Sequence, residues 1–248
     1  MINLFICETK KYKNTYINLL AFLGMISPVI LLAIAFAAAK SDFIASNSYD
    51  WYSFSTRVVE AFVFLLGPLI TGFISVSSVF YEYQCKTMKN ILATPYSRTQ
   101  VIIAKVLYIS VLVIVLYICV AATNILCAFM LGFNITSEEV IKYSTYFLLA
   151  GVATTIIVPL SMLITLIFRS FIPAMVISVA GIIPNISAYH WDKCYLSPWA
   201  APEVLVLIKA GYLKIDTIYP TITAVSYFVI FLVTVTLYFK NSDQHVDM

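Results

Sequence analysis

Apolar residues follow one another along this chain in long, nearly unbroken stretches. A helix needs about 20 apolar residues to cross the roughly 30 Å of hydrocarbon in a bilayer, because it rises about 1.5 Å per residue. The pattern therefore predicts an all-α, polytopic membrane protein with six transmembrane helices. The expected spans are residues 17–39, 58–80, 101–131, 143–168, 171–189 and 218–239.

One expected span is unusually long, and two others are joined by a very short link. The stretch 101–131 is longer than one perpendicular crossing requires, so its helix should tilt or project beyond the bilayer. Only Arg169 and Ser170 separate the fourth span from the fifth, which predicts a tight helical hairpin with Pro173 in the first turn of its second helix. No repeat or linker divides the chain, so we expect a single membrane domain over residues 1–248.

The composition supports the membrane interpretation and excludes other classes of protein. Hydrophobic residues make up 62% of the chain, against roughly 45–50% in a soluble domain. Charged residues make up 11%, where about 25% is usual. Too few charged side chains are present to cover a soluble fold, which argues against a soluble enzyme, a disordered chain and a nucleic-acid-binding domain.

The distribution of lysine and arginine predicts the orientation, because cytoplasmic loops carry an excess of both. One side of the membrane would carry nine basic residues, namely Lys10, Lys11, Lys13, Lys86, Lys89, Arg98, Lys105, Arg169 and Lys240. The other side would carry six, namely Lys40, Arg57, Lys142, Lys193, Lys209 and Lys214. We therefore expect both termini in the cytoplasm. The abundance of Ile, Lys, Asn and Tyr suits an AT-rich bacterial genome, so the expected location is a bacterial plasma membrane.

The motifs of common enzymes are missing from the sequence. No glycine is followed by lysine, so the chain has no phosphate-cradling loop for ATP. Its two histidines and five unclustered cysteines predict no metal site. The acidic pair Glu138-Glu139 is better explained as part of a helix start, with Thr136 and Glu139 as a capping box. We therefore expect no enzymatic activity and no cofactor bound by this chain.

The segment between the second and third spans, residues 81–98, carries the most information. Cys85, Met88 and Leu92 share one helical face there, which predicts a short amphipathic helix over about 82–94. Pro95 should end it, and Ser97 can cap the next helix. The residues alone leave two interpretations open: a loop resting on lipid headgroups, or a lever that a cytoplasmic partner pushes.

This segment resembles the cytoplasmic coupling helix of type-2 ABC transporter permeases. The matching positions are Glu82, Thr87, Ile91-Leu92, Pro95, Ser97-Arg98 and Lys105, and Lys86 replaces the family's usual glycine. The resemblance implies that residues of this segment contact an ATPase subunit. They are Glu82, Lys86, Lys89 and Arg98, which would orient the contact, Met88 and Leu92, which would insert, and Thr87, Pro95 and Ser97, which shape the segment.

The resemblance also implies the partners and the activity. It implies two copies of a separate cytoplasmic ATPase that bind ATP and magnesium, a second permease subunit, same or related, and export by alternating access. It further implies a basic, amphipathic N-terminal segment and short extracellular re-entrant helices before the last span. The chain resembles permeases of lantibiotic immunity, bacitracin resistance or phenol-soluble-modulin export. An amphipathic peptide or lipid-like cargo would follow, and the alternative is a stand-alone immunity protein that sequesters a toxic peptide.

A few polar residues lie inside or near the expected spans. Glu60 could be a gate in a substrate pathway, but Arg57 is placed three residues earlier to pair with it, and a plain interfacial ion pair is favoured. Asn124 is another candidate pathway residue, although a hydrogen bond between helices is the better explanation. Three prolines could kink their spans, namely Pro28, Pro68 and Pro159.

Overall fold

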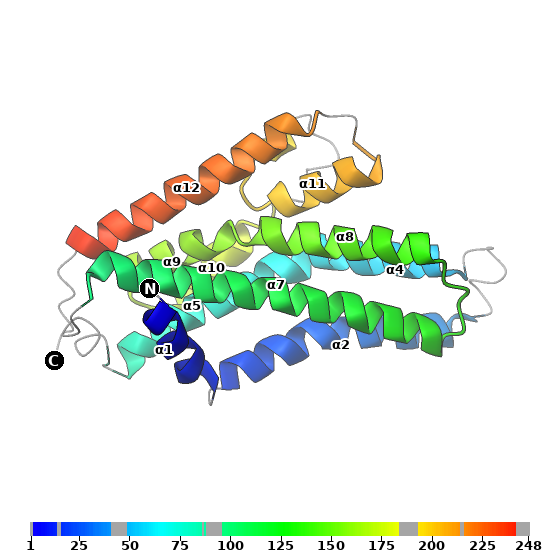
Figure 1. Cartoon of the computed structure of the whole chain (residues 1–248), viewed down its shortest axis with the longest axis horizontal. Coiled ribbons are helices and arrows are strands. Elements are labelled where there is room, and N and C mark those ends of the chain that lie inside the picture. The colour runs from blue at the N-terminus through cyan, green and yellow to red at the C-terminus, as the bar shows by residue number, and fades with distance from the viewer. Residues whose placement is uncertain are drawn as a thin grey trace.

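The computed structural model describes residues 2–13, 16–40, 49–85, 87, 96–183, 193–213 and 216–241. Its described part is helical throughout, with no strand, and five helices are long and apolar enough to cross a membrane. The long helices lie side by side along the long axis of the molecule, and the N-terminal helix runs across them (Figure 1). The predicted all-α polytopic class is confirmed.

The described N-terminal half contains one short helix followed by three spans. Helix α1 covers Ile2–Lys13, and α2 (Tyr16–Ala38) corresponds to the predicted span 17–39. The second span consists of α4 (Trp51–Ala61), the π-helical segment η1 (Phe62–Leu66) and α5 (Gly67–Gln84). It is longer at both ends than the predicted 58–80 and takes in Glu82. The third span is α7, Arg98–Met130, whose 33 residues match the predicted over-length stretch.

The π-helical segment has a local cause in the sequence. Pro68 has no N–H to donate and its ring would clash with the carbonyl four residues earlier. Ahead of it the N–H of Gly67 bonds to the carbonyl of Phe62, five residues back, so the helix continues through one wider turn. Gly67 also lies against the hydroxyl of Tyr117 on α7, where a Cβ would have no room.

The fourth predicted span, 143–168, is two helices, α8 (Ser137–Thr154) and α9 (Ile157–Phe168). Pro159 cannot donate to the carbonyl of Thr155, which explains the break at 155–156. The capping box of Thr136 and Glu139 starts α8 as predicted. Arg169 takes the left-handed conformation (φ 49°) between α9 and α10, and the tight hairpin is confirmed.

The fifth predicted span is shorter in the structure than the expected 171–189. Helix α10 covers Phe171–Ala180, about 15 Å at 1.5 Å per residue, and residues 184–192 lie outside the described part. Gly181 ends the helix where a Cβ would collide with the ring of Trp199. Pro184 also disfavours helix at the residue before it.

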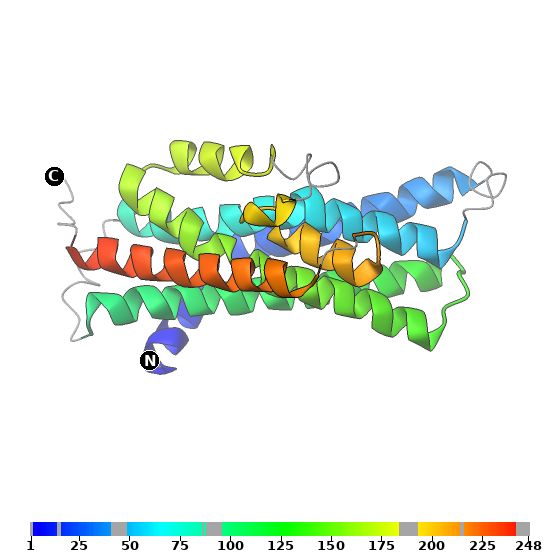
Figure 2. The ribbon, with the colours of Figure 1, turned by 90° about the horizontal axis from the view of Figure 1, so that it is seen from above.

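Two short helices precede the last span, as predicted. They are the 3₁₀ turn η3 (Cys194–Leu196) and α11 (Ala201–Ala210), which ends at Gly211 in the left-handed conformation. Helix α12 (Ile218–Asn241) corresponds to the predicted span 218–239. In the two views α11 lies beside α8, and it occupies the half of the bundle away from α1 (Figures 1 and 2).

The bundle is organised around α7, which packs against α8, α2, α12 and α1. Small residues allow the closest approaches, since α8 passes Tyr117 of α7 at Gly151, where a Cβ would lie 3.0 Å from the tyrosine Cβ. The Tyr117 hydroxyl and Thr154 Oγ1 are 3.1 Å apart, which ties the same pair of helices. Helix α1, the end of α5, the start of α7 and the end of α12 all lie at one end of the bundle (Figure 1).

Candidate functional site

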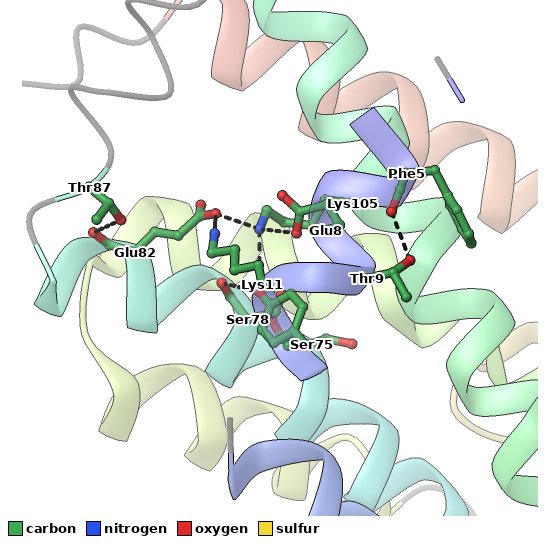
Figure 3. A network of polar contacts seen from close by, with 10 residues as sticks. Phe5, Glu8, Thr9, Lys11, Ser75, Ser78, Glu82, Thr87 and Lys105 are labelled. Atoms are coloured by element: carbon green, nitrogen blue, oxygen red, sulfur yellow. Dashed lines mark hydrogen bonds and ion pairs between the residues drawn. The ribbon is translucent and has the colours of Figure 1, made fainter. Parts of the chain in front are cut away.

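Buried charged side chains gather at the end of the bundle where α5 stops and α7 begins (Figure 3). Glu82 in the last turn of α5 is 2% exposed, and Lys105 on α7 is 1% exposed. The Lys105 ammonium donates to Glu82 Oε1 at 2.7 Å and to Glu8 Oε2 on α1 at 3.1 Å. Lys11 of α1 also donates to Glu82 Oε1. These four residues, Glu8, Lys11, Glu82 and Lys105, form what we call the charge cluster.

Tyr12 extends the charge cluster toward the core. Its hydroxyl donates to the carbonyl of Ser78 on α5 at 3.0 Å and lies 3.5 Å from the Lys105 ammonium. Its ring stacks on Tyr108 of α7, with centroids 5.2 Å apart. Burial raises the pKa of Tyr12 to about 12, so the phenol stays neutral at physiological pH. One side chain of α1 therefore contacts both α5 and α7.

The charge cluster balances two acids against two bases. A buried ion is unfavourable unless it is paired and hydrogen-bonded. Loss of one partner from a buried pair typically costs about 3–5 kcal/mol, because the other charge is left uncompensated. Since the pairs connect three helices, α1, the end of α5 and the start of α7 should move together.

The sequence predicted two members of this cluster but not their pairing. Glu82 and Lys105 were identified through the resemblance to a family motif, and the structure places their charged groups in contact. Glu8, Lys11 and Tyr12 were missed. Their spacing of three and four residues puts them on one face of α1, which is the signal that could have identified them.

The segment that follows α5 begins with a defined helix end. The N–H and the hydroxyl of Thr87 both lie within bonding distance of the Glu82 carbonyl, at 3.1 and 3.4 Å. At its far side the Ser97–Gln100 capping box starts α7 as predicted. Arg98 donates to the carbonyl of Lys240, which links the start of α7 to the end of α12.

Several predicted ATPase-contact residues lie outside the described part of the chain. They are Lys86, Met88, Lys89, Leu92 and Pro95, together with most of the expected helix 82–94. Glu82 belongs to α5 rather than to a separate surface helix, and its carboxylate points to α1 (Figure 3). A contact between this segment and an ATPase stays a prediction.

The candidate pathway residues fall into two environments. Asn124 is 1% exposed and donates to Ser55 Oγ at 3.0 Å, which confirms a hydrogen bond between α7 and α4. Arg57 and Glu60 instead line a cavity between α4, α8 and α11. The Arg57 guanidinium lies 5.8 Å from the ring centre of Phe36, and its predicted pairing with Glu60 stays a prediction.

Comparisons with known proteins agree with this architecture. Residues 4–185 match the family model described as ABC-2 family transporter protein. The chain is also 24% identical, over 185 residues, to the bacitracin transport permease protein BCRB of Bacillus licheniformis, which covers 74% of this chain and 88% of that protein. Members of this family are transmembrane subunits that rely on a separate ATPase. The resemblance seen in residues 82–105 is thus confirmed over most of the chain, which belongs to the ABC-2 transporter family as a multi-pass permease subunit without an ATPase site of its own.

Proposed function

We propose that this permease exports amphipathic or antimicrobial peptides, or lipid-like cargo, by alternating access. Two copies of a cytoplasmic ABC ATPase that bind ATP and magnesium would drive it, and a second permease subunit, same or related, would complete the pathway. The bacitracin transport permease among its relatives supports a peptide cargo. The described ends of the chain lie at one end of the bundle, which supports termini on the same side, and we place that side in the bacterial cytoplasm.

The charge cluster is the observation that supports a route for the energy. Glu82 lies in the last turn of α5, only a few residues before the segment 86–95, where the sequence predicts the ATPase contact. A displacement of that segment would reach α5 through the Thr87 contacts to the Glu82 carbonyl, and then α1 and α7 through the buried ion pairs. We therefore assign Glu82 as a positioning residue for the segment 86–95, which we call the coupling segment. A transmitted movement also requires the ATPase to bind the two states with different affinity.

Co-purification tests the proposal directly. The full chain carrying an affinity tag is co-expressed with the ABC ATPase subunits of the same genome, and ATPase retention is measured in detergent. Leu92→Asp places a charge on the predicted contact face and should abolish retention and peptide tolerance of the cells. Glu138→Gln, at an exposed position of α8 outside both that segment and the cavity between α4, α8 and α11, should leave both intact. If the unaltered chain retains no ATPase and still protects cells from a peptide, the exporter is contradicted in favour of a sequestering immunity protein.

A further inference from the structure

A second polar site lies in the half of the bundle away from the charge cluster. It is a cavity of about 410 Å³ between α4, α8 and α11. Thr56 and Glu60 reach it from one stripe of α4, and Glu203 and Leu207 reach it from one stripe of α11. Residues four apart on a helix share a face, so the sequence of each helix presents a mixed polar and apolar wall to this space.

Glu203 is the feature of this cavity that requires an explanation. Its side chain is buried, with 2% of the residue exposed, and it lines the cavity. Within the described residues neither carboxylate oxygen has a hydrogen-bond partner. A buried acceptor left without a partner typically costs about 1–3 kcal/mol, and more when it is charged. The acid complements the dipole in the first turn of α11, but that position does not require burial.

Tyrosines also line the cavity, and the hydroxyl groups of three of them have hydrogen-bond partners. The hydroxyls of Tyr52 and Tyr212 are 2.9 Å apart. Tyr143 donates to the carbonyl of Tyr52 at 3.2 Å and lies 3.0 Å from the hydroxyl of Thr56. The rings of Tyr143 and Tyr146 meet edge to face. Such a wall offers aromatic surface to an occupant, together with the one hydroxyl of the Tyr52–Tyr212 pair that accepts and so keeps its own proton to donate.

A cation of the chain itself already lies against the aromatic wall of the cavity. The ammonium of Lys142 lies 5.7 Å from the ring centre of Tyr52, at a distance typical of a cation–π contact. Aromatic rings beside carboxylates are the chemistry that recognises organic ammonium groups. Arg57 and Lys142 also line the cavity, but within the described residues no hydrogen bond from either reaches the Glu203 carboxylate, which attracts a cation and repels an anion.

We propose that this cavity binds the ammonium group of an amphipathic ligand, with Glu203 as its counter-ion, Glu60 as a second acid and the tyrosine rings as its apolar wall. The proposal rests on the proposed function in one respect, since it assigns the ammonium to a lysine side chain or an amino terminus of the peptide cargo.

Binding should depend on pH because Glu203 must be ionised. Burial, and then the nearby Glu60 carboxylate, raise the pKa of Glu203 to about 7. The other charged or titratable groups that face it are Arg57 on α4, Lys142, Tyr143 and Tyr146 on α8, and Tyr52 and Tyr212. The segments η1 and η3 that pack on α11 contain no charged residue, and α12 contains only Lys240, in its last turn. Affinity for a cation should therefore rise as pH increases through about 7.

The test uses the full chain in phosphatidylcholine nanodiscs and isothermal titration calorimetry with three probes of similar size. They are 2-phenylethylammonium, 2-phenylethanol and 3-phenylpropanoate, with empty nanodiscs as the blank. The ammonium should bind about tenfold or more tightly than the other two. Glu203→Gln, which keeps the side-chain shape, should remove about the same factor, and the exposed Glu138→Gln on α8 should change nothing. A thermal melt verifies that each variant is folded.

The pH series adds a second readout. The amine stays protonated below about pH 9, as lysine does. Its affinity should rise from about pH 6 to 8 in the unaltered chain and stay flat in Glu203→Gln. Equal binding by the folded Glu203→Gln variant, preference for the carboxylate probe, or a flat profile in the unaltered chain would each overturn the proposal. Because no ATPase is present, the outcome is independent of the co-purification test, and either proposal can fail alone.

Discussion

The two halves of the bundle differ in whether a buried carboxylate has partners. At one end Glu82 is enclosed by Lys11 and Lys105, so its charge is compensated inside the chain. In the other half Glu203 is as deeply buried, yet no hydrogen bond reaches its carboxylate within the described residues. A compensated charge holds helices together, whereas an uncompensated one leaves free energy that a ligand can recover. The contrast separates a mechanical junction from a binding site.

The largest expected effect is the loss of stability on breaking the buried ion pair between Lys105 and Glu82. Lys105→Met leaves Glu82 and Glu8 with one base fewer and should destabilise the protein by about 3–5 kcal/mol, measured as a lowered melting temperature in detergent. Lys240→Met, an exposed lysine at the same end of the bundle, is the matched control. The double variant Lys105→Met/Glu82→Leu should recover part of the loss. A Lys105→Met protein as stable as its control would mean that the cluster does not hold these helices.

The next effect concerns Glu203, whose replacement should raise stability rather than lower it. A carboxyl whose pKa is raised on folding binds more protons in the folded state, so stability falls as pH rises from the ordinary value of 4.5 to about 7. Each pKa unit corresponds to about 1.4 kcal/mol, which sets an upper limit of roughly 3 kcal/mol. Glu203→Gln should therefore melt at a higher temperature than the unaltered chain at pH 8 and at a similar one at pH 4.5. Parallel melting profiles of the two proteins would contradict the assigned environment.

A smaller effect is expected where the coupling segment enters α7. Ser97→Ala removes the side-chain acceptor of the capping box and should cost about 1 kcal/mol. Thr136→Ala removes the equivalent cap at the start of α8 and should cost about the same in thermal stability. If Ser97 also shapes the ATPase contact, only Ser97→Ala should reduce ATPase retention in the pull-down. Equal retention by both variants would restrict Ser97 to the helix cap.

The smallest effect tests an uncharged polar contact between helices. Asn124→Ala should lower stability by about 0.6 kcal/mol, the average for such hydrogen bonds in membranes, apart from any loss of packing. Ser55→Ala serves as the partner variant, and the two changes should not add, because they remove the same bond. Fully additive losses would show that the contact between α7 and α4 contributes no bond energy.

Residue patterns predicted the helices well where the cause is local. The starts of α7 and α8 follow from the Ser97 and Thr136 capping boxes, and the turn at Arg169 follows from the two-residue link. The predicted helix ends were wrong where tertiary packing sets them. The fifth span was expected to reach residue 189, but α10 ends at Ala180, and the ring of Trp199 occupies the space that a side chain would need at the following Gly181. A contact between residues 18 apart leaves no periodic signal.

The residues of the two polar sites also divide into those with a signal in the sequence and those placed by tertiary contacts. Glu82 and Lys105 were recognisable because their types and spacing resemble a family motif, whereas Glu8 and Lys11 carried no such signature. Glu203 looked like an ordinary helix-dipole residue, since its position in the first turn explains its charge equally well in water. Burial is set by neighbours from distant segments, and the sequence alone did not reveal that this acid faces a cavity.

By itself the sequence determined that this is an all-helical membrane protein, and its resemblance to a family indicated a permease powered by a separate protein. Long apolar stretches have one stable arrangement in lipid, because every backbone polar group must be bonded within its own helix. The tertiary structure alone decided what the few charges do. It brought Glu8, Lys11, Glu82 and Lys105 together from three helices, and it left the Glu203 carboxylate beside a cavity with no hydrogen-bond partner among the described residues. In a low-dielectric interior the consequence of a charge depends on whether an opposite charge lies within a few ångströms, and only folding sets that distance.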